Sequence, residues 1–259
     1  MSQEWNVNPT NASEYAQACM EFVNDDAAFS NFKRDARYKK ILEHVKRPES
    51  LMFINEMKNR EGVITPELLE KFKENDRYGN AEILQYDFFG SISPSTIRYI
   101  KNTLDVIAEF DTSKIKNIVE IGGGYGGLCK TLSCAIDFDN YVIIDLPEAS
   151  ALQEKYISKF EDLNGKFRAL PFTELDSIDG IDLVISNYAF SECSMDIQEK
   201  YYNDVVLNAK SFYMVYNNIT PGNMNSTDYL LRASKDFNIE AETEVRPGHT
   251  NYIYFANKK

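Results

Sequence analysis

Apolar side chains recur every three or four positions through most of the first hundred residues. In SEYAQACMEFV they fall on one face of a helix, as they do in NFKRDARYKKILEHV and ESLMFINEM. The first of these stripes consists of Tyr15, Ala18, Cys19, Phe22 and Val23. Each segment is therefore predicted to be a helix that covers another part of the molecule.

Two further helices carry start signals. Thr65 precedes Pro66 in TPELLEKFKEN, and Ser93 precedes Pro94 in SISPSTIRYIKNTLDVIAEF. A Ser or Thr side chain can cap the first N–H groups of a helix, and proline is tolerated at the first helical position because no donor is needed there. The second helix presents one apolar stripe, made of Ile97, Ile100, Leu104 and Ile107. We expect this helix to lead directly into the segment that follows it.

From residue 115 onward the pattern changes to short β-rich runs. KIKNIVEI, NYVIIDL, GKFRAL, IDLVIS and FYMVYN are separated by helix-compatible stretches, which predicts a doubly wound α/β domain with a mostly parallel sheet. The last two runs, FNIEAETEV and NYIYFAN, are joined only by RPGHT, which is too short for a crossover helix. They are predicted to pair antiparallel. The change of pattern divides the chain into an N-terminal helical region, 1–110, and an α/β domain, 111–259.

The composition excludes several classes of function. The chain of 259 residues has 40 acidic and 28 basic residues, and its net charge of -12 disfavours nucleic-acid partners. No stretch approaches the roughly 20 apolar residues of a membrane span, and MSQEWNVNPT contains no apolar signal core. The four cysteines show no metal-ligand spacing, so reduced thiols in the cytoplasm are expected. Homo-oligomer formation is left open.

The main candidate for chemistry is the glycine-rich stretch IVEIGGGYGGL at 118–128. Glycine weakens strands and helices by roughly 0.5–1 kcal/mol per residue, so five of them indicate that something approaches the bare backbone. Gly122, Gly124 and Gly127 fit the G-x-G-x-x-G pattern of dinucleotide-binding loops. That match alone does not identify the ligand.

A second pattern fits the same loop. Glu120, followed by Gly122, Gly124 and Gly126, matches the acidic-x-G-x-G-x-G pattern of S-adenosylmethionine-dependent methyltransferases. A carboxylate there can order the loop or bind the ammonium group of a ligand, whereas it would repel a pyrophosphate. Asp145 ends the next β-rich run, about 20 residues downstream, where a carboxylate can bind ribose hydroxyls. The antiparallel pair resembles the reversed last strand of this methyltransferase class, and it favours S-adenosylmethionine over NAD.

Longer strings make the resemblance more specific. YGNAEILQYDFFGSISPSTIRYIKNTLDVIAEF, VEIGGGYGGLCKTL, YVIIDLPEASALQEKY and SNYAFSE together resemble the bacterial sugar O-methyltransferase family, over roughly residues 78 to 258. The resemblance implies a seven-stranded Rossmann-like class I methyltransferase sheet with an antiparallel last strand, behind an N-terminal helical appendage. It also implies S-adenosylmethionine as cofactor and a small-molecule sugar or nucleotide sugar as substrate.

The resemblance further implies which residues bind the cofactor. They lie at the ends of the β-rich runs, where open α/β sheets bind ligands. The glycines would admit the methionine part, Asp145 would bind the ribose, and Asn187 would lie where donor and acceptor meet. The expected cofactor residues are Glu120, Gly122, Gly123, Gly124, Gly126, Asp145, Leu146, Pro171, Phe172, Asn187 and Tyr188.

Methyl transfer to a hydroxyl needs alignment of the two partners and removal of one proton. Of the two histidines, His249 lies in the predicted hairpin near the carboxyl edge of the sheet. His44 lies on a predicted helix of the N-terminal region, where a solvated or packed role is expected. His249 is therefore the first candidate for the general base, although a histidine in a turn can also serve only to bond backbone. Glu192 and Asp87 are the reserves.

The remaining candidates concern the acceptor, and each has a plainer structural alternative. Tyr86 and Phe88 could line a sugar pocket, but aromatic residues in this chain mostly build core. Arg98 and Tyr99 could clamp a phosphate or lean over the cofactor, or form the outer face of their helix. The basic run from Lys33 to Arg47 is interpreted as a solvated helical surface, with attraction of a nucleotide-sugar diphosphate as the alternative. No cluster has metal-ligand spacing, so metal independence is predicted.

Two other functions would use the same glycine loop. An NAD(P)-dependent oxidoreductase would place a pyrophosphate there, and equilibrium binding of NADH against S-adenosylmethionine would separate the two. A catalytically silent adenosyl-binding partner protein would bind the cofactor and transfer no methyl group.

Overall fold

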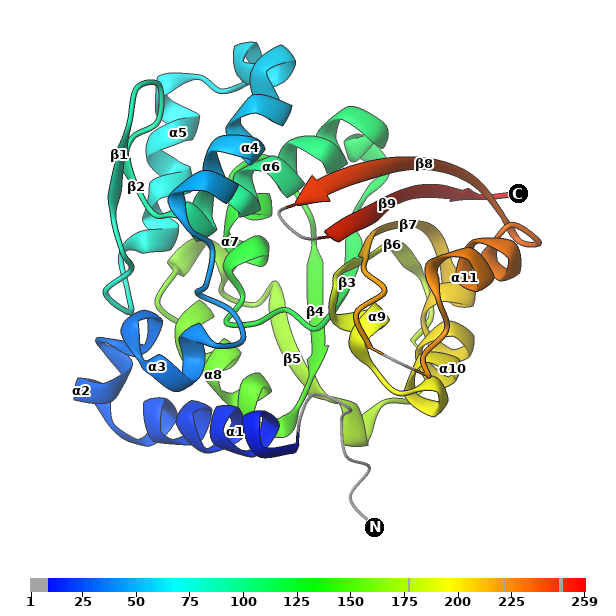
Figure 1. Ribbon diagram of the computed structural model, residues 1–259, viewed down its shortest axis with the longest axis horizontal. Coiled ribbons are helices and arrows are strands. Elements are labelled where there is room, and N and C mark those ends of the chain that lie inside the picture. The colour runs from blue at the N-terminus through cyan, green and yellow to red at the C-terminus, as the bar shows by residue number, and fades with distance from the viewer. Residues whose placement is uncertain (1–8, 177, 221, 247–248) are drawn as a thin grey trace.

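The computed structural model describes residues 9–176, 178–220, 222–246 and 249–259, without the side chains of residues 9–12, 59–61, 245 and 249. A seven-stranded sheet lies at the centre of the molecule in the order β5-β4-β3-β6-β7-β9-β8 (Figure 1). β9 runs antiparallel to β7 and β8, and the other neighbouring strands are parallel. The predicted mostly parallel sheet and its antiparallel C-terminal pair are confirmed. The strands are β3 (Asn117–Ile121), β4 (Asn140–Asp145), β5 (Phe167–Pro171), β6 (Ile181–Asn187), β7 (Ala209–Tyr216), β8 (Phe237–Arg246) and β9 (His249–Lys258).

Helices cover both faces of this sheet. Successive strand residues point to opposite faces, so Ile143 packs into the core beside α7 and α8 while Ile144 packs into the core beside α10 and α11. Burial on both faces explains why runs such as NYVIIDL are almost continuously apolar. The helices that follow β3 are α7 (Gly127–Ser133), α8 (Pro147–Ile157), α9 (Ala189–Glu192), α10 (Met195–Asp204) and α11 (Ser226–Ala233).

The N-terminal helices pack against the α/β domain and share its hydrophobic core. Phe22 of α1 and Phe32 lie in one hydrophobic cluster with Tyr156 of α8. The two predicted helix starts are confirmed, because the Thr65 side chain accepts from the N–H of Leu68 and the Ser93 side chain accepts from the N–H of Thr96. The N-terminal helices are α1 (Pro9–Asn24), α2 (Asp26–Phe29), α3 (Ala36–Lys39), α4 (Arg47–Met57), α5 (Pro66–Lys73) and α6 (Pro94–Glu109).

The prediction of one helix across NFKRDARYKKILEHV is wrong. The segment forms a 3-10 helix at Phe32–Arg34, the short α3, and turns that contain His44, which is exposed and not on a helix. Asp35 breaks the helix, since its backbone is extended and its side chain caps α3 by accepting from the N–H of Arg37. Lys33 does not belong to a solvated face, because it is 2% exposed and donates to the Asn75 carbonyl over 2.5 Å.

A small hairpin, β1 (Leu84–Tyr86) and β2 (Gly90–Ile92), was not predicted. Its strands have three residues each, too few for the alternation of apolar and polar positions to show. It lies beside α5 at the outer side of the helical region (Figure 1). Short 3-10 helices also occupy Lys58–Val63, Glu74–Asp76, Thr112–Lys114, Glu161–Leu163, Phe172–Glu174 and Val206–Asn208.

Candidate active site

The glycine loop follows β3 at the carboxyl edge of the sheet. Gly122, Gly124 and Gly126 have φ angles of 72°, 60° and 93°, which L side chains rarely adopt. A Cβ atom on Gly122 would lie 2.1 Å from the Cβ of Ala189, and one on Gly124 would lie 3.2 Å from the Leu42 side chain. Both the backbone angles and the close packing therefore require these glycines.

Asp145, at the end of β4, is joined to this loop through Gln153 of α8. The Gln153 side-chain nitrogen donates to the Asp145 carboxylate and to the Gly124 carbonyl, each over 2.9 Å. The other Asp145 oxygen accepts from the N–H of Leu146 over 2.8 Å. Burial raises the pKa of Asp145 to about 6. The link holds a carboxylate and the glycine loop in one fixed arrangement, and the sequence prediction missed Gln153.

Glu120 lies beneath the loop. It is buried, and the hydroxyl of Tyr141 donates to it over 2.8 Å. A Cβ atom on Gly123 would lie 3.0 Å from its carboxylate. Burial raises the pKa of Glu120 to about 8. These contacts fit a side chain that ties down its loop, and a direct link to a cofactor stays a prediction.

The end of β6 brings together polar side chains from three distant parts of the sequence. Asn102 of α6 donates to the Asn187 side-chain oxygen over 3.0 Å, and the Asn187 side-chain nitrogen has no partner. Tyr188 has a φ of 70°, and its hydroxyl donates to Glu244 over 2.9 Å. Strained backbone of this kind at a strand end is a frequent feature of functional sites.

Glu192, at the end of α9, lies between the carboxyl ends of β6 and β7. Its carboxylate accepts from the Asn217 side chain over 2.7 Å, and burial raises its pKa. The adjacent Ser191 donates to the Tyr188 carbonyl over 2.7 Å. Glu192 is thus linked to Tyr188 by hydrogen bonds through Asn217 and Ser191.

The side chain of His249 lies outside the described residues, so its role as general base stays a prediction. Its backbone is described and pairs with Arg246 at the start of β9. The last residue of β7, Tyr216, pairs with Tyr252. His249 therefore begins β9 beyond the carboxyl end of β7, at the edge of the sheet where it was expected.

The substrate candidates fall into two groups. Tyr86 is buried and bonded to the Ser50 hydroxyl at 2.6 Å, while Asp87 and Phe88 are exposed in the β1–β2 turn. Tyr86 and Phe89 pack into the hydrophobic cluster that holds Phe53 of α4, Phe72 of α5 and Ile97 of α6. A role of this turn in acceptor binding stays a prediction. Arg98 and Tyr99 are 8% and 6% exposed, so the alternative that they form the outer face of α6 is wrong.

The expected adenine-side residues lie together at the β4–β5 edge. Pro171 pairs with Asp145 in the sheet, and both Leu146 and Pro171 are half-buried. Phe172 is buried and its ring contacts Tyr201 of α10, with 5.2 Å between ring centroids. Binding of adenine by these residues stays a prediction.

A buried network of charges joins the N-terminal helices to the C-terminal hairpin. Arg246 of β8 contacts Glu244 and donates to Glu56 of α4 over 3.0 Å. Lys101 of α6 lies 2.6 Å from Asp105 and 3.8 Å from Glu244. These contacts span up to 190 positions of sequence, so the local patterns could not reveal them.

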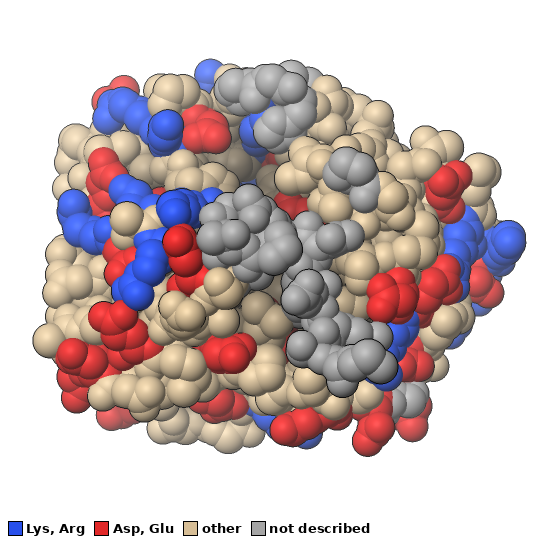
Figure 2. Space-filling model, turned by 60° about the horizontal axis from the view of Figure 1, so that its bottom comes forward, with Lys and Arg blue, Asp and Glu red and all other residues tan. Residues whose placement is uncertain are grey.

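Basic side chains gather on the left of the face shown in Figure 2, which the first helices form. Three basic residues of the run from Lys33 to Arg47 are paired: Arg37 with Glu21, Lys39 with Glu82 and Lys40 with Glu14, at 2.9 to 3.1 Å. Ion pairing lowers the positive charge available to attract a nucleotide-sugar diphosphate. That attraction stays a prediction.

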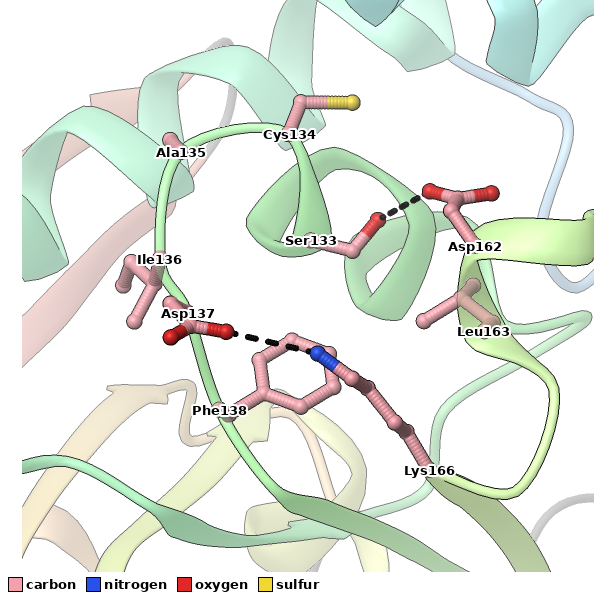
Figure 3. Close-up of a pocket in the computed structure, with 9 residues that line it drawn as sticks. All are labelled: Ser133, Cys134, Ala135, Ile136, Asp137, Phe138, Asp162, Leu163 and Lys166. Atoms are coloured by element: carbon pink, nitrogen blue, oxygen red, sulfur yellow. Dashed lines mark hydrogen bonds and ion pairs between the residues drawn. The ribbon is translucent and has the colours of Figure 1, made fainter.

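A hollow of about 330 Å³ lies away from these residues, at the end of α7 and the start of β4 (Figure 3). Its polar side chains pair with one another, Lys166 with Asp137 at 3.3 Å and Ser133 with Asp162 at 3.5 Å. None of the expected site residues lines it. In the part of the chain that the structure describes, no three His, Cys, Asp or Glu side chains gather to hold a metal ion, and no helix is long and apolar enough to cross a membrane.

No protein-family model and no curated protein matches the chain. Among solved structures it is similar to magnesium protoporphyrin IX methyltransferase from Synechocystis PCC 6803 with bound S-adenosylmethionine. The TM-score is 0.51 at 11% identity, over 62% of this chain and 78% of that chain. It is also similar to the mitomycin 7-O-methyltransferase MmcR, with a TM-score of 0.49 at 14% identity over 63% of this chain, and to M. capricolum TrmK in complex with S-adenosylhomocysteine, with 0.43 at 15% over 57%. The match spans 55% of MmcR and 66% of TrmK.

The order of the strands and the single antiparallel β9 define the fold. It is the Rossmann-like fold of class I methyltransferases, with an N-terminal helical part. The fold class expected from the sequence is confirmed.

Proposed function

We propose that the chain is an S-adenosylmethionine-dependent methyltransferase that methylates a hydroxyl of a sugar, in a nucleotide sugar or a surface-glycan precursor. The observation that carries the proposal is the Gln153 side chain, which bonds both Asp145 and the Gly124 carbonyl at 2.9 Å. In a sheet of this strand order, the link holds a ribose-binding carboxylate beside the loop expected to receive the methionine part.

Buried polar atoms without partners support the fit of this cofactor. Such atoms are rare in native proteins and call for an explanation. Ser150 and Gln153 each have one on α8, just after Asp145, and Arg98 and Asn187 each have one on the opposite side of the glycine loop. A ligand with hydroxyls at one end and an amino acid at the other would supply partners to both groups.

The bound cofactor would supply a methyl group activated by its sulfonium. The residues of the chain would align the acceptor hydroxyl near Asn187 and Tyr188 and take its proton. As the oxygen–methyl bond forms and the carbon–sulfur bond breaks, that proton would pass to a nearby base. Glu192 suits this role because burial raises its pKa and so makes its carboxylate a stronger base, and His249 remains the alternative.

The sugar acceptor rests on the resemblance of residues 78 to 258 to sugar O-methyltransferases. We also propose the division into a helical region, 1–110, that covers the site and a cofactor-binding domain, 111–259. Asn102 of α6 supports it, because this residue of the helical region bonds Asn187 at the end of β6. A cytoplasmic location fits the four cysteines, which are free thiols.

The proposal is tested by incubating the protein with methyl-labelled S-adenosylmethionine and a panel of nucleotide sugars. Label in a sugar product is the expected result. Binding of the cofactor without S-adenosylhomocysteine formation on any acceptor would instead indicate the catalytically silent partner protein. Binding of NADH in place of S-adenosylmethionine would indicate the oxidoreductase.

A further inference from the structure

One face of α6 carries three polar residues at helical spacing, and a buried nitrogen of the middle one lacks a hydrogen-bond partner. Ser95 donates to Glu43 over 2.9 Å, and Asn102 donates to Asn187 over 3.0 Å. Arg98 lies three residues after Ser95 and four before Asn102, so the three side chains share one face of the helix. The Arg98 Nε has no hydrogen-bond partner.

Arg98 also lacks a counter-ion. Its side chain is 8% exposed, and it forms no ion pair within 4.0 Å with any carboxylate that the structure describes. The ring of Tyr99 lies beside it, with 5.4 Å between the ring centroid and the guanidinium carbon. A buried cation without a paired anion is costly, so the arrangement indicates a place for an anionic group.

Glu43 shows the complementary feature. It is 8% exposed, Ser95 bonds one of its carboxylate oxygens, and the other oxygen, Oε1, is buried without a partner. The cations that interact with it are Lys33 and Arg98, and neither approaches within ion-pair distance. Lys33 instead donates to the Asn75 carbonyl. Glu43 and Arg98 thus lie near one face of α6 with opposite charges but form no ion pair with each other.

Both residues flank the glycine loop. Leu42, next to Glu43, lies 3.2 Å from the position of a Cβ atom on Gly124. Tyr99, next to Arg98, lies 2.5 Å from the position of a Cβ atom on Gly127. The Glu43 carboxylate and the Arg98 guanidinium, neither of which forms an ion pair with a described residue, are therefore held beside the loop that would receive the methionine part of the cofactor.

We propose that Glu43 and Arg98 bind the amino-acid end of S-adenosylmethionine, Glu43 its ammonium group and Arg98 its carboxylate. A zwitterion supplies both missing partners at once, whereas a pyrophosphate would satisfy Arg98 and be repelled by Glu43. The inference rests on the proposed function, because it requires this cofactor. It assigns Arg98 to the cofactor, where the sequence had placed it with the substrate, and it adds Glu43, which the sequence did not single out.

Isothermal titration with two ligands tests the proposal. S-adenosylhomocysteine has the amino-acid end, and 5′-methylthioadenosine lacks it. Arg98→Met and Glu43→Gln should each weaken S-adenosylhomocysteine binding by about 10- to 100-fold, the effect of losing a charge-assisted hydrogen bond. The affinity for methylthioadenosine should stay within about twofold of wild type, and Arg98→Lys should recover part of the loss. Lys46→Met is the matched control, since it removes an exposed positive charge from the same segment.

Unchanged S-adenosylhomocysteine affinity in both variants would overturn the inference, and so would an equal loss of affinity for both ligands. If Arg98→Met bound S-adenosylhomocysteine normally and raised only the KM of the acceptor, the anion would belong to the acceptor and the proposal would be wrong. Failure of wild type to bind either ligand would instead contradict the proposed function itself. Circular dichroism of each variant shows whether it is folded before titration.

Discussion

The Tyr188 hydroxyl donates a hydrogen bond to the Glu244 carboxylate over 2.9 Å and so joins the end of β6 to β8. Glu244 is 2% exposed and also accepts from Asn251 over 2.8 Å. Tyr188 has a positive φ that the surrounding contacts must hold in place. The acceptor side of the candidate site is therefore supported by the C-terminal hairpin.

Glu244→Gln is expected to destabilise the protein. It removes one of the two carboxylates that pair with the buried Arg246, while Glu56 remains, and breaking a buried pair costs up to about 3–5 kcal/mol. Tyr188→Phe should cost about 1–2 kcal/mol through the lost hydrogen bond. Urea unfolding measures both free energies. Glu242→Gln, an exposed change on the same strand, is the control and should shift the free energy of unfolding by no more than about 0.5 kcal/mol. Equal values for the three variants would exclude a stabilising role of the network.

Glu120→Gln should stabilise the protein at alkaline pH. The folded-state pKa of Glu120 is raised from 4.5 to about 8, so its stability contribution is full below pH 4.5 and declines as the pH rises toward 8. The glutamine stays neutral and can still accept from Tyr141. Calorimetry should give a gain on the order of 5 kcal/mol at pH 8.5 and none at pH 4. A difference that did not change with pH would contradict the burial of an ionisable carboxyl group.

Much of the fold could be predicted because its signals are local. The change from helical to strand periodicity near residue 115, the Ser93–Pro94 helix start and the five-residue RPGHT connection each lie within a short stretch of sequence. The break at Asp35 was missed because the apolar residues on both sides of it keep helical spacing. Asp35 nevertheless ends one helical turn and caps the start of α3. The three-residue strands of β1 and β2 are too short to carry a pattern.

Of the candidate site, only the residues at the ends of the strands could be predicted from the sequence. The glycine loop, Asp145 and Asn187 sit where the topology of parallel strands places ligand contacts. Gln153, Glu43 and Glu244 could not be found in this way, because their roles come from contacts with residues that are distant in the sequence. A lone Glu or Gln on a helix or strand is most often a solvated side chain.

Asp145→Ala should weaken S-adenosylhomocysteine binding by about 1–3 kcal/mol and leave the fold intact, because charge-assisted hydrogen bonds to the ribose are lost. Gln153→Met keeps a similar volume and removes the link to Gly124, so it should weaken binding less than Asp145→Ala does. Titration calorimetry gives both affinities. Wild-type affinity in Asp145→Ala would remove this residue from the site.

Glu192→Gln and His249→Gln separate the two main candidates for the base. The variant that lacks the base should lose about 10²–10⁴-fold in kcat while S-adenosylhomocysteine affinity stays near wild type. The wild-type rate should fall as the pH drops below the pKa of the base, and that limb should vanish in the same variant. Asp87→Asn is the third measurement. Near-wild-type kcat with an unchanged pH limb in all three variants would exclude all three residues.

The cofactor claim is tested most directly by thermal unfolding with S-adenosylhomocysteine or NADH present. A ligand that binds only the folded state stabilises it by about 2.7 kcal/mol at 100 times its Kd. For a chain of this size each kcal/mol raises Tm by about 2–4 °C. S-adenosylhomocysteine should raise Tm by several degrees, and by much less in Gly124→Val, whose branched side chain does not suit the left-handed backbone at this position. NADH should leave Tm unchanged. A shift with NADH, or no shift with millimolar S-adenosylhomocysteine, would contradict the account.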